Sequence, residues 1–165
     1  MYSIVRTASV QGIKSVPVYV EADVSDGMPI FEMVGFLSAE VKESKERVRT
    51  ALRNAGYILP PKRITINLIP ANIRKTGSGF DLPVALAILS AIGIVPKEKL
   101  KDVFVVGEVS LSGEIHSVNG ILPMCIEALK LGIKKVVVPE ENAKEAAIVK
   151  EMEVLGAKNL KQRKK

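Results

Sequence analysis

Residues Arg63–Gly93 read RITINLIPANIRKTGSGFDLPVALAILSAIG and contain an apolar run that must lie at the centre of the fold. The first part, residues 64–69, is rich in β-branched side chains and predicts a strand, which Pro70 ends because it has no N–H to donate. From Leu82 to Ile92 the only polar side chain is that of Ser90. A helix that is apolar all round is buried on every side. We therefore predict a central helix that the other elements surround.

The ends of this helix carry sequence signals of their own. Asp81 stands at the position expected for an N-cap, and Pro83 falls in the first turn, where a missing N–H costs nothing. Gly93 is expected to close the helix as a C-cap. Between Pro70 and Asp81 lies a polar, glycine-rich loop.

Alternation and turn residues predict the remaining elements. The N-terminal third is predicted to form three strands arranged as an antiparallel meander, over residues 2–10, 16–24 and 30–36. A single helix is expected from Ser38 to Ala55, opened by Ser38 as N-cap. The rest is predicted as a helical turn over 96–100, strands over 103–109 and 114–118, a helix over 121–131, a strand over 135–138, a helix over 142–150 and a strand over 152–155. Early strands followed by alternating strands and helices indicate an α+β fold, with a mixed sheet covered by helices.

Composition favours one globular domain. The 165 residues are 47% apolar and 25% charged, and no apolar run reaches the length of a membrane span. The single cysteine, Cys125, suits a reducing compartment, and the first residues have no secretory signal pattern, so we expect a cytoplasmic location without a metal site.

The net charge of +6 comes mostly from the last eight residues, KNLKQRKK. Without their five basic residues, 19 basic and 18 acidic residues remain. We therefore expect one domain over residues 1–157 and a basic tail without regular structure over residues 158–165.

Two groups of basic residues are candidates for contact with nucleic-acid phosphates. Lys42, Lys45, Arg49 and Arg53 recur at helical spacing and share one face of the predicted helix. Arg74 and Lys75 lie in the loop before the central helix. Glu40, Glu43 and Glu46 partly offset the first group, and an ordinary solvated helix face is the alternative interpretation.

The glycine-rich loop invites comparison with phosphate-binding loops, and the comparison fails. Gly77-Ser78-Gly79 is followed by no lysine, whereas the P-loop pattern is G-x-x-x-x-G-K-[ST]. The lone histidine, His116, lies in a predicted hairpin, where a structural or exposed role is more common than catalysis. Ser78 could act as a nucleophile only beside a lysine that the spacing does not identify.

Three segments resemble the N-terminal domain of the ComM/YifB family: VKESKERVRTALRNAGYILPPKRITINLIPANIRKTGSGFDLPVALAILSAIG (41–93), GEVSLSGEIHSVNGILP (107–123) and IKKVVVPEENAKEA (133–146). These are magnesium-chelatase-like AAA+ proteins linked to DNA branch migration during natural transformation. The resemblance covers about Tyr2 to Leu155. It implies the fold of ribosomal protein S5 domain 2, shared with the proteolytic domain of Lon and the C-terminal domain of RadA, in line with the α+β prediction.

The resemblance to Lon can be followed to its catalytic Ser–Lys dyad. Aligning the central helices places the Lon serine at Gly79, one residue after Ser78. Aligning the following helix places the Lon lysine at Met124. Since both members of the dyad are replaced, the resemblance implies a domain without peptidase activity.

The resemblance therefore implies a non-catalytic accessory domain that helps a downstream AAA+ motor to form a ring, a hexamer in the full-length family, and to engage DNA. ATP and Mg²⁺ would belong to that motor, and this chain is expected to hold no cofactor. A Lon-like serine peptidase domain and a domain that binds a chelatase partner are the alternatives.

Overall fold

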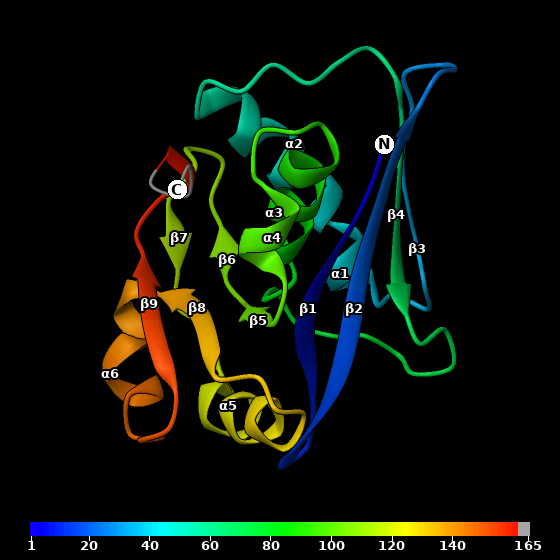
Figure 1. Ribbon diagram of the computed structural model, residues 1–165. Coiled ribbons are helices and arrows are strands. Elements are labelled where there is room, and N and C mark those ends of the chain that lie inside the picture. The colour runs from blue at the N-terminus through cyan, green and yellow to red at the C-terminus, as the bar shows by residue number, and fades with distance from the viewer. Residues whose placement is uncertain (162–165) are drawn as a thin grey trace.

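The structure, a computed structural model, describes residues 1–161. Its nine strands are β1 (Tyr2–Gln11), β2 (Lys14–Ser25), β3 (Phe31–Val34), β4 (Arg63–Ile69), β5 (Val103–Val105), β6 (Glu108–Val109), β7 (Ile115–His116), β8 (Lys135–Pro139) and β9 (Glu153–Ala157). Its helices are α1 (Ala39–Lys42), α2 (Ser44–Asn54), α3 (Asp81–Ala91), α4 (Lys97–Leu100), α5 (Ile121–Lys130), the 3₁₀ turn η1 (Glu140–Asn142) and α6 (Ala143–Ala146). These elements confirm the predicted α+β class (Figure 1).

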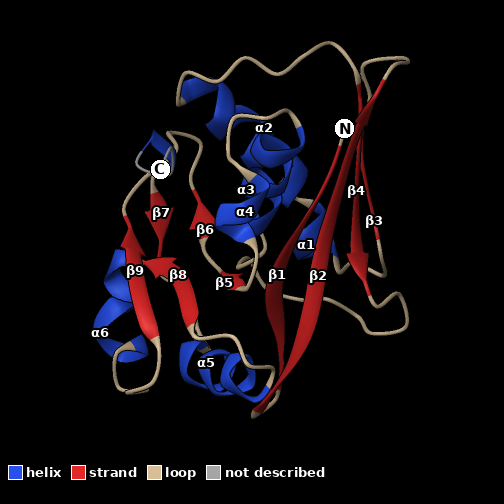
Figure 2. Cartoon of the chain, in the orientation of Figure 1, coloured by secondary structure: helices blue, strands red, loops and turns tan. Residues whose placement is uncertain are grey.

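Seven strands form one mixed sheet in the order β3-β4-β2-β1-β5-β8-β9. The β1–β2 and β2–β4 ladders are antiparallel, and the other four ladders are parallel. β6 and β7 form a separate two-stranded sheet. Helices cover this mixed sheet, as the sequence predicts (Figure 2).

The central helix is the best-predicted element. Every residue of α3, Asp81–Ala91, is buried, and the helix packs on β1 and β2 with α2 on its far side. Gly93 follows it with a positive φ of 87°, as expected of a C-cap glycine. A second apolar cluster, formed by α5 and α6 with β5 and β8, lies on the opposite face of the sheet.

The N-terminal strands do not form a simple meander. β3 pairs in parallel with β4 instead of antiparallel with β2, because the chain runs from β3 through α1 and α2 before it returns as β4. β4 thereby inserts between β3 and β2, so the predicted arrangement of the third strand was wrong.

Three predicted elements are broken where a single one was expected. Glu43 separates α1 from α2 within the predicted helix, although the Ser38 hydroxyl accepts from the Val41 N–H at 3.2 Å, as a cap should. The predicted strand 103–109 ends at Val105 and resumes at Glu108, because Val106 and Gly107 leave the large sheet for the small one. The last predicted helix is a 3₁₀ turn and a four-residue helix.

The first residues of the expected tail are packed against the body. Leu160 is fully buried, its N–H donates to the Gly113 carbonyl at 2.9 Å, and its own carbonyl accepts from the Tyr57 hydroxyl at 3.2 Å. For residues 158–161 the expectation of a free tail is therefore wrong. Residues 162–165, the rest of that expected tail, lie outside the described residues.

Candidate functional site

The loop before α3 borders a cavity of about 220 Å³. Residues 76–80 of the loop form one wall, Ala8 and Val10 of β1 another, and Met124 of α5 closes it. Gly79 and Met124, at the positions that correspond to the Lon dyad, thus line one cavity. Neither side chain can act as nucleophile or base.

The space beside Gly79 is also too small for a serine in the present packing. A Cβ built on Gly79 would lie 2.9 Å from Cγ2 of Val106, a branched and therefore stiff side chain. The nearby hydroxyl of Ser78 donates to the Glu108 carboxylate. Its hydrogen-bond partner is thus an acid, and not the lysine that a Ser–Lys dyad requires.

The backbone donors at the start of α3 are largely used by the protein itself. The Gly77 N–H donates to Oε1 of Glu40 at 2.7 Å. The Asp81 and Leu82 N–H groups donate to the carbonyls of Ser78 and Gly107, at 3.4 and 2.9 Å. This arrangement favours the interpretation of a tight structural loop over that of a phosphate cradle.

Asp81 has a different role from the predicted N-cap. It lies inside the first turn of α3, where its carboxylate accepts from Nε and Nη2 of Arg47 at 2.8 and 3.0 Å and from the Val109 N–H at 3.0 Å. Burial raises the pKa of Asp81, and the hydrogen bonds from Arg47 act in the opposite direction. The same contact raises the pKa of Arg47. The pair joins α2 to the core helix.

The sequence interpretation missed Arg47. A carboxylate beside an all-apolar helix signals the need for a cation. The chain offers many basic residues, however, and helical spacing alone does not say which of them reaches Asp81.

Lys75 must be removed from the predicted nucleic-acid contacts. Its side chain is fully buried, and Nζ donates to the carbonyls of Gly35, at 2.7 Å, and Pro70. Burial lowers the pKa of this ammonium group. Lys75 therefore ties the glycine-rich loop to the chain after β3, and it is not available to a phosphate.

The other predicted contact residues reach the surface unequally. Lys45, Arg49 and Arg53 share one face of α2, whereas Lys42 belongs to the separate helix α1. Arg49 already donates to both carboxylate oxygens of Glu46 at 2.7 Å, and Lys45 is half-buried. Arg74 is exposed in the loop that meets α1 through the Gly77–Glu40 bond. The structure thus leaves Lys42, Arg53 and Arg74 as the most accessible of the set.

His116 has the exposed position expected of it. Its side chain is half-exposed in β7, and its Nε2 lies 3.9 Å from the Glu114 carboxylate. Across residues 1–161, no three His, Cys, Asp or Glu side chains gather in a way that could hold a metal ion. None of the helices in this range is both long and apolar enough to span a membrane.

Residues 20–142 match the family described as subunit ChlI of Mg-chelatase. The YifB protein of Escherichia coli (strain K12) is 40% identical over 147 residues, which are 89% of this chain and 29% of that protein. The competence protein ComM of Haemophilus influenzae is 37% identical over 158 residues, 96% of this chain and 31% of ComM. A Lon protease of Geobacter metallireducens is 29% identical over 152 residues, 85% of this chain and 18% of the protease. The chain thus spans about a third of the length of its YifB and ComM relatives.

Proposed function

The chain belongs to the family of subunit ChlI of Mg-chelatase, and from this premise we propose that it is the non-catalytic N-terminal accessory domain of a ComM/YifB-type AAA+ ATPase. In this role it helps the motor to assemble into a ring and to engage DNA during competence or recombination. Its partners are the downstream AAA+ domain, further copies of itself and DNA, in the cytoplasm. ATP and Mg²⁺ belong to the downstream domain, since the loop before α3 does not have the P-loop pattern.

One observation carries the non-catalytic part of the proposal. Gly79 and Met124 line the same cavity, where the related Lon proteases are expected to hold a serine and a lysine. The remaining hydroxyl, that of Ser78, is bonded to Glu108. A serine without a positioned base is a poor nucleophile.

The DNA part rests on the exposed basic residues around α1, α2 and the loop. Lys42, Arg53 and Arg74 support it best, Lys45 and Arg49 support it less, and Lys75 does not contribute. Among these residues there is no aromatic side chain on which a base could stack. We therefore expect weak, sequence-independent and salt-dependent binding that becomes useful when several copies act together.

A fluorophosphonate probe tests the absence of peptidase activity. We expect no labelling of the chain, and none in the variant Gly79→Ser/Met124→Lys, because Val106 crowds position 79. Labelling that disappears in Ser78→Ala would contradict the proposal.

A salt titration of DNA binding tests the second part. We expect the folded domain to bind DNA more weakly when Lys42, Arg53 and Arg74 are changed to Glu. For this comparison both proteins carry neutral residues in place of Arg163, Lys164 and Lys165, so that these charges do not bind DNA themselves. The unaltered protein is measured as well. If neutralising Arg163, Lys164 and Lys165 alone abolishes its DNA binding, and the Glu substitutions at Lys42, Arg53 and Arg74 have no further effect, the result would argue against a DNA site on this surface. Shortening the chain to Leu155 is not a suitable control, because it would cut β9 and remove the buried Leu160.

A further inference from the structure

The segment that follows β9 is fixed beside the small β6–β7 sheet. The Ile115 N–H donates to the Lys158 carbonyl at 2.8 Å. The Leu160 N–H donates to the Gly113 carbonyl at 2.9 Å. These two bonds, with an antiparallel bridge between them, add residues 158–160 to the edge of the hairpin. A chain that continues beyond residue 161 therefore leaves the domain at a defined place.

A tight turn beside this segment holds an apolar side chain out in solvent. Residues 110–113 join β6 to β7, and the Gly113 N–H closes the turn by donating to the Ser110 carbonyl at 2.9 Å. Asn54, at the end of α2, donates from Nδ2 to the Leu111 carbonyl at 2.7 Å. The turn is thus fixed to a helix, and yet the Leu111 side chain is 53% exposed.

The chain after α2 presents a second apolar side chain. Tyr57 is buried, and its hydroxyl donates to the Leu160 carbonyl at 3.2 Å. The next residue, Ile58, is 88% exposed. A hollow of about 200 Å³ lies between Ala55, the turn and residues 159–161. Apolar side chains on a fixed backbone lose little conformational freedom when they bind, so docking costs less here than on a mobile loop.

The length of the relatives indicates what lies beside this surface. The chain spans about a third of the length of its YifB and ComM relatives, so most of a protein of that length lies outside this structure. A domain joined closely to residue 161 is held near the surface at an effective concentration of roughly millimolar. At that concentration a small apolar surface is enough for docking, whereas an untethered second copy needs a full-sized interface.

We propose that the downstream motor domain docks on this end of the domain, the exit surface, which consists of Ala55, Ile58, Leu111 and residues 159–161. This inference rests on the proposed function, because it names the surface by which the accessory domain contacts its motor. We expect the opposing face of the motor to be apolar where it meets Ile58 and Leu111. The exit surface includes none of the residues proposed to contact DNA, so docking and DNA binding use separate side chains.

Hydrogen–deuterium exchange followed by mass spectrometry tests the proposal. The 165-residue chain is compared with a longer protein that carries residues 1–161 in front of an AAA+ motor domain. We expect the backbone amides of residues 112–114 and 159–161 to exchange roughly tenfold more slowly in the longer protein, because docking excludes water from them. The double variant Ile58→Ser/Leu111→Ser of the longer protein should lose this protection.

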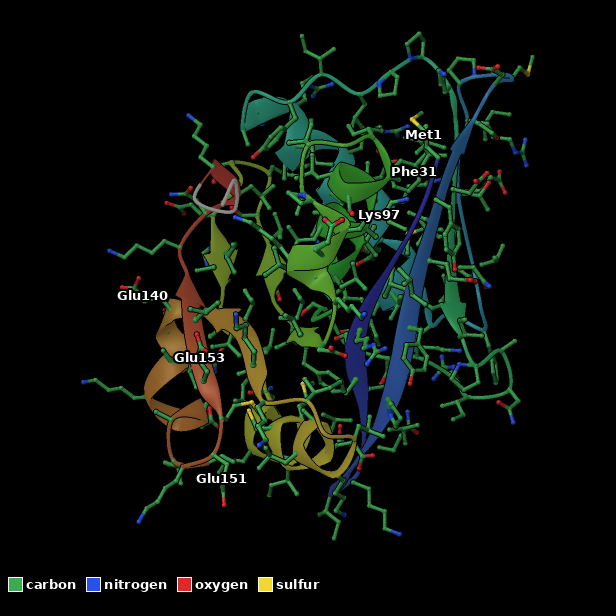
Figure 3. The ribbon with its side chains drawn as sticks, viewed as in Figure 1. Met1, Phe31, Lys97, Glu140, Glu151 and Glu153 are labelled. Carbon is green, nitrogen blue, oxygen red and sulfur yellow. The ribbon has the colours of Figure 1, made fainter. Side chains whose placement is uncertain are left out.

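The matched control is Ile13→Ser/Leu131→Ser, which also removes one isoleucine and one leucine. Ile13 is 92% exposed and Leu131 43% exposed. They lie in the β1–β2 turn and at the end of α5, at the end of the molecule where Figure 3 labels Glu151. The control should keep the protection. Circular dichroism verifies that each protein is folded, and alanine replaces serine in any variant that is not.

Three results would overturn the proposal. The exchange of the two segments could be the same in both proteins, or the control variant could lose as much protection as the test variant. The 165-residue chain alone could also show protection that rises with its own concentration, which would assign the exit surface to a second copy.

Deleting residues 1–161 from the longer protein separates this inference from the proposed function. If the exit surface is not protected but the deletion still impairs ring formation or DNA association, the docking surface is refuted and the accessory role stands. If the surface is protected but the deletion changes neither property, the docking surface stands and the accessory role fails.

Discussion

Replacing Arg47 by methionine should destabilise the domain by about 3 kcal/mol, because the change leaves a buried carboxylate without its cation. Asp81 is fully buried, and Arg47 donates to both of its oxygens. In the variant only the Val109 N–H bond is left from this set of contacts. Breaking a buried pair in this way costs roughly 3–5 kcal/mol. The Arg47 side chain is 23% exposed, so water can partly replace it, and we expect the lower end of that range.

The pH dependence of the stability lost in Arg47→Met identifies the cause of that loss. Burial already raises the pKa of Asp81, and removing Arg47 should raise it further. When the pKa of a carboxyl group is higher in the folded than in the unfolded protein, the group contributes its full stabilisation at pH values below its pKa in the unfolded protein. This contribution is lost as the pH rises through its pKa in the folded protein. The deficit of the variant should therefore be largest at neutral pH and shrink as the pH falls toward the ordinary aspartate pKa of about 4.

Urea unfolding followed by circular dichroism, at neutral and at acidic pH, measures both effects. Arg49→Met is the matched control, since it removes the same side chain from the same helix but breaks only an exposed pair with Glu46. It should cost no more than about 1 kcal/mol. The reasoning is refuted if Arg47→Met costs as little as this control, or if its deficit does not change with pH.

Three further substitutions test other parts of the fold by the same unfolding measurement. Leu86→Ala should cost roughly 2–5 kcal/mol, because Leu86 is fully buried in α3, and a loss under about 1 kcal/mol would contradict that packing. Lys75→Met should destabilise by about 1–3 kcal/mol for each of the carbonyls of Gly35 and Pro70 that it leaves without a donor, and an unchanged midpoint would mean that water replaces the ammonium group. Ser38→Ala should cost about 1 kcal/mol through the lost cap on α1, whereas Ser38→Gly should cost only a few tenths, and equal losses would refute the capping role.

The core of this fold can be predicted from the sequence because one helix has no polar face. A helix over residues 82–92 has no polar face and must therefore be buried. β1 and β2, whose side chains alternate between the two faces of the sheet, form the surface on which it packs. The placement of β3 cannot be predicted in this way. Alternation identifies a strand but not its neighbour, and the pairing with β4 depends on the path of the chain through α1 and α2.

The candidate site was predicted in part. The positions Gly79 and Met124 came from resemblance to Lon, since no period relates residues so far apart, and the cavity then brought them together. A basic residue in a polar loop is normally exposed, so Lys75 looked like a phosphate contact. Its burial depends on the carbonyl of Gly35, 40 residues away.

Deleting residues 1–161 from a longer protein that contains this domain and a downstream ATPase domain would test the central claim most directly. The measurement is the sedimentation of the protein with ATP, with and without DNA, beside its rate of ATP hydrolysis. An accessory domain for assembly and DNA engagement predicts that basal hydrolysis per motor persists while ring formation or DNA association falls. The claim is contradicted if the deleted protein assembles and binds DNA as well as the intact one.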